Sequence, residues 1–172
     1  MSLDDGVQLR TARAGDIEAM AAFIFEHGPN PWNFLPEDEV HEHLAGIADG
    51  RVQALLAEER GLLAGFITFY FSTGFAEHQE AGRDDSPRAY VCEAVVHREL
   101  AGRGLGSRML RAVVERLAEQ GVGDVYIERH EENAGSAGMM RKAGFRELRT
   151  FDDPQRRATG SRRTTLCHLR LD

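Results

Sequence analysis

The chain of 172 residues carries a net charge of −7 and is 42% hydrophobic, which makes it long enough for one domain with a core and too short for two ordinary domains. We therefore expect a single domain over residues 1–172. The acidic balance argues against a nucleic-acid surface and is compatible with a cationic acceptor, and no apolar run approaches the roughly 18 residues of a membrane span.

The first third of the chain predicts a strand and two helices. The N-terminus lacks the basic and apolar regions of a signal peptide, so we expect a cytoplasmic protein. A short strand at 7–10 precedes a helix that Asp16 caps. A second helix begins at Pro36 and ends at Gly50. The two helices bury apolar faces made of Ile17, Met20, Ala21 and Ile24 in the first and Val40, Leu44 and Ile47 in the second.

The loop between these helices carries Trp32 and Phe34. Each aromatic ring is either a wall of a substrate pocket or a hydrophobic anchor of the loop, and packing is the default. In the second helix, His41 and His43 are two residues apart and so lie on different faces, which argues against a shared metal ion. We expect both histidines at the solvated surface.

A hairpin follows, with strands at 52–57 and 62–71 that are rich in β-branched and aromatic residues. The polar connection from Ser72 to Arg88 is long for a compact domain, which favours a lid over a substrate site or a mobile loop. Its His78 is a candidate for the substrate pocket.

The strongest chemical signal is a strand ending at His97, a loop with glycines at 102, 104 and 106, and an amphipathic helix that Gly121 closes. Glycines leave the backbone N–H groups uncovered, and the helix dipole adds partial positive charge, so this loop predicts a phosphate site. The loop lacks the lysine of a P-loop and the third glycine of a dinucleotide fingerprint.

The last third predicts a strand at 124–129, a helix that Asn133 caps, and closing strands at 145–150 and 164–171. The loop between the closing strands carries four arginines, which we expect to be solvated: Arg156, Arg157, Arg162 and Arg163. The two cysteines, Cys92 and Cys167, form no disulfide framework or metal spacing, so we expect them reduced and buried, and we expect no metal.

Two spaced motifs resemble the GNAT superfamily of N-acetyltransferases. Residues 101–106 fit the pattern [QR]-x-x-G-x-[GA] except at Ala101, and residues 133–145 fit N-x-x-[AS]-x-x-x-Y-x-x-x-G-F except at Met140, where the family usually has tyrosine. The resemblance extends from about Val7 to Leu171. It implies an α/β fold with a central mixed, mostly antiparallel sheet of six to seven strands and helices on both faces, which agrees with the predicted order βααβββ-α-β-α-ββ.

The resemblance also implies acetyl-CoA as the acetyl donor. In the family, the strand before the glycine loop splays from its neighbour at a bulge, and its backbone N–H groups face the thioester and pantetheine. By position, the residues implied to bind the donor are Val95, Val96, His97, Arg103, Gly104, Leu105, Gly106, Ser107, Asn133, Ser136 and Met140.

Glu93 is the candidate general base. It stands in an apolar strand segment, where an unpaired carboxylate has a raised pKa, and an acidic residue here resembles the base of many relatives. The alternative is a carboxylate that pairs with an arginine of a neighbouring element. Cys92 is a weaker candidate as nucleophile, because a buried thiol has a raised pKa.

The leading hypothesis is an acetyl-CoA-dependent N-acetyltransferase that acts on a small-molecule or peptide amine by direct attack in a ternary complex. One rival is a non-catalytic acyl-CoA-binding regulatory module, to which Met140 gives weight. Another is a regulatory domain that binds a different nucleotide at residues 102–106. The acceptor pockets of the family are built from variable loops, so the sequence does not identify the amine. The sequence also leaves both a monomer and a homodimer as alternatives.

Overall fold

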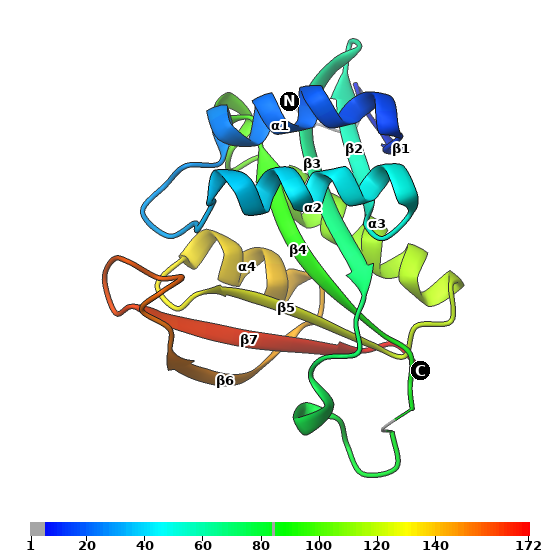
Figure 1. The fold of residues 1–172 in the computed structure, drawn as a ribbon, viewed down its shortest axis with the longest axis vertical. Helices are drawn as coiled ribbons and strands as arrows, with labels where there is room; N and C mark the ends of the chain where they lie inside the picture. The colour runs from blue at the N-terminus through cyan, green and yellow to red at the C-terminus, as the bar shows by residue number, and fades with distance from the viewer. Residues whose placement is uncertain (1–5, 84) are drawn as a thin grey trace.

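The computed structural model describes residues 6–83 and 85–172 and folds them around one seven-stranded sheet (Figure 1). The strand order is β1-β2-β3-β4-β5-β7-β6, and every pair is antiparallel except β4 and β5, which are parallel. The strands are β1 (Val7–Thr11), β2 (Gln53–Glu59), β3 (Leu62–Phe71), β4 (Arg88–Val96), β5 (Asp124–His130), β6 (Arg146–Asp152) and β7 (Arg163–Arg170). This mixed, mostly antiparallel sheet confirms the predicted fold class.

Helices cover both faces of the sheet. On one face, α1 (Ile17–His27) and α2 (Glu37–Asp49) bury an apolar cluster that includes Met20, Leu44 and Phe66. On the other face, α3 (Leu105–Glu119) and α4 (Ala134–Lys142) cover the larger cluster. Three short 3-10 helices complete the elements of the described residues: η2 (Ala14–Asp16), η3 (Ala76–His78) and η4 (Arg98–Leu100). None of the helices in the described ranges has the length and hydrophobicity needed to span a bilayer.

The parallel strands β4 and β5 separate part of the way along the sheet. Their pairing starts at Arg88 and Asp124 and ends at Val91 and Ile127, although both strands continue. At the same level β4 bulges against β3, where Thr68 stands opposite the extra residue. The extra residue bends the bulged strand, and the sheet opens between β4 and β5.

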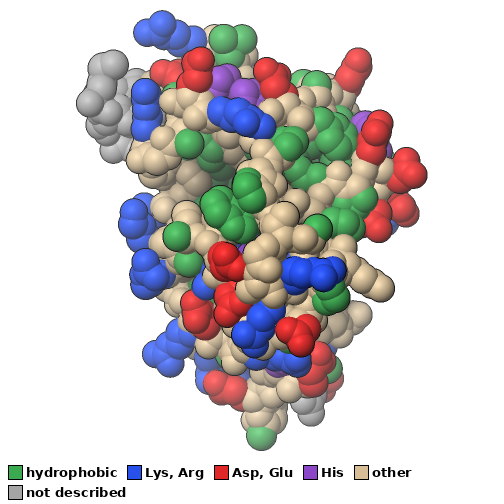
Figure 2. Space-filling model, turned by 90° about the vertical axis from the view of Figure 1, so that its left-hand side faces the viewer, with side chains coloured by type: hydrophobic (Ala, Val, Ile, Leu, Met, Phe, Trp, Pro, Cys, Tyr) green, Lys and Arg blue, Asp and Glu red, His purple; other side chains and the backbone are tan. Residues whose placement is uncertain are grey.

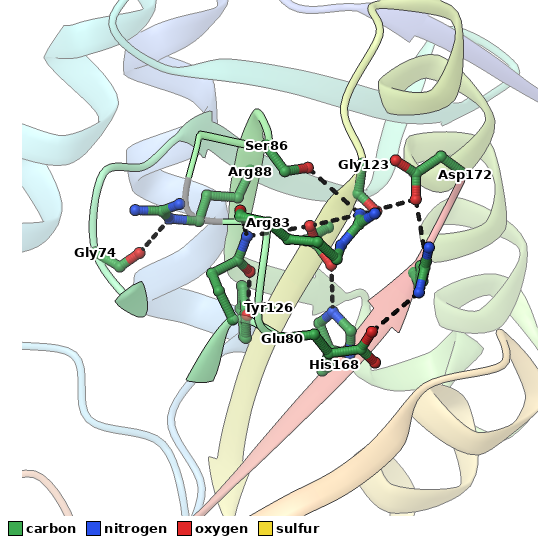
Figure 3. A network of polar contacts seen from close by, with 12 residues as sticks. Gly74, Glu80, Arg83, Ser86, Arg88, Gly123, Tyr126, His168 and Asp172 are labelled. Atoms are coloured by element: carbon green, nitrogen blue, oxygen red, sulfur yellow. Dashed lines mark hydrogen bonds and ion pairs between the residues drawn. The ribbon is translucent and has the colours of Figure 1, made fainter. Parts of the chain in front are cut away.

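The connection between β3 and β4 is bonded to the end of the sheet opposite this opening (Figures 1 and 3). The buried carboxylate of Asp124, 2% exposed, accepts hydrogen bonds from Arg83 Nη2 at 2.9 Å and from Gln79 Nε2 at 3.2 Å. His168 Nε2 lies 2.7 Å from the same carboxylate. The expectation of a lid is wrong, because none of the described residues between 72 and 87 lines either of the cavities at the opening.

Candidate active site

Two cavities, of about 340 and about 720 Å³, meet where β4 and β5 separate. The smaller lies against α2 and the β6–β7 connection, and the larger lies against the glycine loop and α4. Figure 2 views the molecule from the side where the α1–α2 and β6–β7 connections lie in Figure 1; acidic and basic side chains intermingle over its lower half. Five residues line both cavities: Asn33, Ala94, Asn133, Ser136 and Met139.

The glycine loop lines the larger cavity with backbone. Gly104 has φ of +84°, which sets the chain to enter α3, and the first helical hydrogen bond runs from Arg108 N–H to the Gly104 carbonyl at 3.0 Å. The N–H groups of Leu105, Gly106 and Ser107 therefore precede the first bonded turn and have no acceptor within the helix. A Cβ atom on Gly104 would project into open space rather than into protein. This cradle fits a phosphate group.

The remaining predicted donor-binding residues fall into two groups. Asn133 accepts a hydrogen bond from Ser136 N–H at 3.1 Å as the N-cap of α4, and both side chains line the larger cavity. His97 and Arg103 do not line that cavity. The His97 ring packs against His27, with ring centroids 4.0 Å apart, and its Nδ1 accepts from Glu99 N–H.

The backbone of β4 offers a donor at the open edge of the strand. His97 N–H donates to the Ala64 carbonyl at 2.9 Å, and the register places Val96 opposite Gly65 and Val95 opposite Phe66. Hydrogen-bonded and non-hydrogen-bonded pairs alternate along an antiparallel ladder, so the N–H of Val96 faces the opening and that of Val95 faces β3. Of the two backbone donors that the resemblance implies, only Val96 points toward the larger cavity.

Glu93 lies in the bulge of β4 and lines the smaller cavity. Its backbone N–H donates to Thr68 Oγ1 at 3.0 Å, which fixes the bulge. Burial raises the pKa of its carboxyl to about 7, against lowering effects from the Arg157 charge and from the Cys92 thiol 3.9 Å away. No arginine among the described residues forms an ion pair with Glu93. Burial also raises the pKa of Cys92, which argues against a thiolate nucleophile.

A chain of polar contacts crosses the wall of the smaller cavity. The Tyr90 hydroxyl donates to Glu128 at 2.8 Å. Arg156 holds both oxygens of the Glu128 carboxylate, at 3.1 and 3.2 Å, and also bonds Asp153 at 2.8 Å. Arg156 is therefore paired with two carboxylates rather than solvated as its loop position suggested.

Arg157 departs furthest from the sequence expectation. The residue is only 9% exposed and lines the smaller cavity. Its Nε donates to Thr164 Oγ1 at 2.9 Å and its Nη1 to the Trp32 carbonyl at 3.2 Å. Neither acceptor is charged, and burial lowers the pKa of the guanidinium, followed by the effect of the Arg156 charge. The sequence offers no signal for this burial, because the loop contains four arginines and no periodicity.

The other residues discussed as candidates for the substrate pocket differ in whether they line a cavity. Phe34 lines the smaller cavity, whereas Trp32 contributes its carbonyl to Arg157 and its ring lines neither cavity. His78, on η3, lines neither cavity. His43 lies in the smaller cavity, 2.7 Å from Thr68 Oγ1, so the expectation of a solvated His43 is wrong. His41 lies at the surface as expected.

Met140 is 3% exposed and belongs to the core beneath α4, while also lining the smaller cavity. A thioether therefore occupies the place where the resemblance implies a tyrosine hydroxyl. It cannot donate a proton.

Comparison with known proteins identifies the family and shows the same fold in solved structures. The family model described as the acetyltransferase (GNAT) family matches residues 17–145. No curated protein sequence matches the chain. Among solved structures, a ribosomal-protein-alanine N-acetyltransferase from Brucella melitensis has a TM-score of 0.74 and 20% identity, covering 95% of this chain and 99% of that one.

Two further structures have the same fold. The structure of yncA from Salmonella typhimurium, solved with its cofactor acetyl-CoA, has a TM-score of 0.73 and 19% identity, with 98% of this chain and 95% of that one covered. An IAA acetyltransferase from Bacillus cereus has a TM-score of 0.68 and 15% identity, with 96% and 99% covered. The family match covers most of the chain, and the chain therefore belongs to the GNAT family of acetyltransferases, whose acyl donor is acetyl-CoA.

Proposed function

We propose that this protein is an N-acetyltransferase that moves the acetyl group of acetyl-CoA to an amine by direct attack in a ternary complex. The observation that carries the proposal is the meeting of the two cavities at Ala94 and Met139, which line both. One cavity has a cradle that suits phosphate, and the other has a carboxyl group suited to proton removal. A donor and an acceptor bound in these cavities would meet without a covalent enzyme intermediate.

The donor would bind through backbone groups. The free N–H groups of the first turn of α3 suit the pyrophosphate of coenzyme A, and Asn133 and Ser136 would line the path of its pantetheine arm. When bound, acetyl-CoA supplies the thioester carbonyl that an amine attacks. The N–H of Val96 faces the opening and is the candidate donor to the developing oxyanion.

Glu93 is the candidate general base. A carboxyl group with a pKa of about 7 is ionised in about half of the molecules at neutral pH and still accepts a proton readily. It would take the proton from the attacking amine directly or through one water. Because Met140 cannot donate a proton, the departing thiolate leaves without an acid at that position, which is chemically tolerable for a group with the pKa of an ordinary thiol.

Release of free thiol tests the proposal. The purified protein is incubated with acetyl-CoA and a panel of amines: amino acids, polyamines, arylamines and short peptides. Thiol release that depends on one of the amines, with the acetylated amine found by mass spectrometry, supports the proposal. Calorimetric binding of acetyl-CoA without turnover of any amine would instead favour a non-catalytic acyl-CoA-binding module, for which Met140 is the supporting observation. Preference for ATP or NAD would contradict both functions.

A further inference from the structure

The smaller cavity is lined by a guanidinium that forms no ion pair with a carboxylate of the described residues. Arg157 is 9% exposed, and its two bonded nitrogens donate to a hydroxyl and to a carbonyl oxygen. Its neighbour Arg156, by contrast, is paired with Glu128 and Asp153. Two arginines adjacent in sequence thus differ in their electrostatic environment, and of the two only Arg157 has no carboxylate in an ion pair.

Two carboxylates near the cavity are bonded to other residues. Glu128 is held by both terminal nitrogens of Arg156 and by the Tyr90 hydroxyl. Asp153 accepts from Arg156 Nε and from Thr164 Oγ1 at 2.6 Å. Glu93 forms no ion pair among the described residues, and Glu39 is exposed on α2 at the rim. A buried cation without a partner is unfavourable, and an anionic ligand would remove that cost.

From this arrangement we infer that the acceptor is a free amino acid or a similarly small amine that carries a carboxylate, and that the guanidinium of Arg157 binds this carboxylate. The inference rests on the proposed acetyl transfer and adds the class of acceptor. Arg157 and Glu93 line the same cavity, so an acceptor that presents its carboxylate to Arg157 can present its amine on the side of Glu93. Planar guanidinium groups bind carboxylates with two parallel hydrogen bonds, which also orients the acceptor.

A second observation favours a free acceptor over a polypeptide. The α1–α2 and β6–β7 connections, which form walls of the cavity, are bonded to each other. Arg157 Nη1 donates to the Trp32 carbonyl at 3.2 Å, and the Thr159 hydroxyl donates to the Pro31 carbonyl. A polypeptide leaving the cavity between these connections would have to break both bonds, whereas a free amino acid would not.

The test compares acceptors that differ only at the carboxylate. The best amino-acid acceptor is found by screening the standard amino acids for thiol release, and its kcat/KM is compared with those of its carboxamide and its decarboxylated amine. We expect the carboxylate form to exceed both by about a hundredfold, the range of a charge-assisted bidentate contact. In Arg157→Gln this preference should fall below about tenfold, with Arg157→Lys intermediate.

Arg162→Asn is the matched control. It removes an exposed positive charge from the same connection, and asparagine tolerates the positive φ of 56° at this position. The preference for the carboxylate should be unchanged in this variant. If Arg157→Gln does not fold, the comparison of the three acceptors on the unaltered protein and on Arg157→Lys decides.

Failure of the inference differs from failure of the proposed function. Turnover of polyamines, arylamines or peptides without any preference for a carboxylate overturns the inference and leaves acetyl transfer standing. Equal loss on all three matched acceptors in Arg157→Gln also overturns it. Absence of thiol release with every amine overturns the proposed function and this inference together.

Discussion

Glu93 lies in the bulge of β4, where burial raises its pKa to about 7 and the described residues offer it no arginine as an ion-pair partner. If it is the base, the reaction requires the carboxylate form and also a neutral amine. Below pH 7, log kcat/KM should therefore rise with pH with a slope of about 2, because both groups must lose a proton. Between pH 7 and the amine pKa the slope should be about 1.

Replacing Glu93 by glutamine tests this role. Glu93→Gln should lower kcat/KM by about 10²–10⁴, and the slope below pH 7 should fall to about 1, because only the amine still titrates. Steady-state kinetics from pH 5.5 to 9 provide both readouts. A folded variant that keeps a slope of 2 would assign the second proton to another group, and full activity at pH 7 would remove Glu93 from the mechanism.

The same carboxyl group should destabilise the fold at alkaline pH. Because its pKa in the folded protein is above the ordinary value of 4.5, the folded state binds more protons than the unfolded state between about pH 4.5 and 7. The free energy of unfolding therefore falls as pH rises through this window. Glu93→Gln should be the more stable protein at pH 8, by up to about 3 kcal/mol, and the difference should shrink at pH 5. Urea unfolding at the two pH values measures it, and equal differences at both would contradict the raised pKa.

At the scale of elements, the glycine loop and α3 form the donor-binding unit. Gly104 and Gly121 both have positive φ, +84° and +82°, and added Cβ atoms would meet nothing within 4 Å at either position. Alanine at either site should thus lower stability by a similar amount, about 1 kcal/mol. Only Gly104→Ala places a methyl group at the phosphate cradle, so only it should weaken coenzyme A binding, by about tenfold or more.

Calorimetric titration with coenzyme A, together with thermal unfolding, separates these effects. Gly121→Ala, at the opposite end of the same helix, controls for backbone strain. Equal affinity in the two variants would remove the cradle from the donor site.

The sequence predicts those elements whose structure is determined by their own residues. The loop before α3 needs glycine for its backbone geometry, α4 has an asparagine cap, and the helices have apolar stripes, so each element is predicted by its own residues. The burial of Arg157 and His43 depends instead on contacts with Trp32 and Thr68, which are distant in sequence. Local patterns carry no information about such contacts. The prediction that the arginines of a charged loop are solvated is therefore wrong for Arg157.

The bulge in β4 also results from a contact with a residue that is distant in sequence. It depends on Thr68 of β3, whose hydroxyl accepts the Glu93 N–H and replaces a lost ladder bond. After Arg88, the sequence of β4 is an apolar run with one glutamate. The resemblance to the GNAT superfamily implies a bulge in this strand, whereas the residues of the strand do not predict one.

At the scale of the whole molecule, Asp124 joins the β3–β4 connection to one end of the sheet through Arg83, and it also contacts His168; Figure 3 shows Arg83 and His168. Burial alone would raise its pKa, but hydrogen bonds from His168, Arg83 and Gln79 outweigh burial and lower the pKa. The stabilisation from its ionised form is therefore present above the ordinary value of 3.8 and is lost as pH falls through the lower value of the folded state.

Asp124→Asn should lower the free energy of unfolding at pH 7 by about 1.5–3 kcal/mol, because it removes the charge from a buried acceptor of hydrogen bonds from Arg83 and Gln79. Asp172→Asn is the matched control: this carboxylate also pairs with Arg83, at 2.7 Å, but it is half-exposed, so the loss of stability should be much smaller than for Asp124→Asn. Denaturant unfolding at pH 7 and below pH 3.8 provides the test. The deficit of Asp124→Asn should narrow in acid, and a deficit independent of pH would assign it to packing.

The separation of β4 from β5 leaves an edge of strand inside the protein, and this has a consequence for hydrogen–deuterium exchange. Along β4, His97 and Val95 face β3, while Val96 and Ala94 face the opening. Amide protection should therefore alternate residue by residue in the free protein, with slow exchange at 95 and 97 and fast exchange at 94 and 96. Bound coenzyme A should slow exchange at 96 and leave 95 unchanged. Residues 94 and 96 thus keep their backbone N–H groups for a ligand rather than for a neighbouring strand.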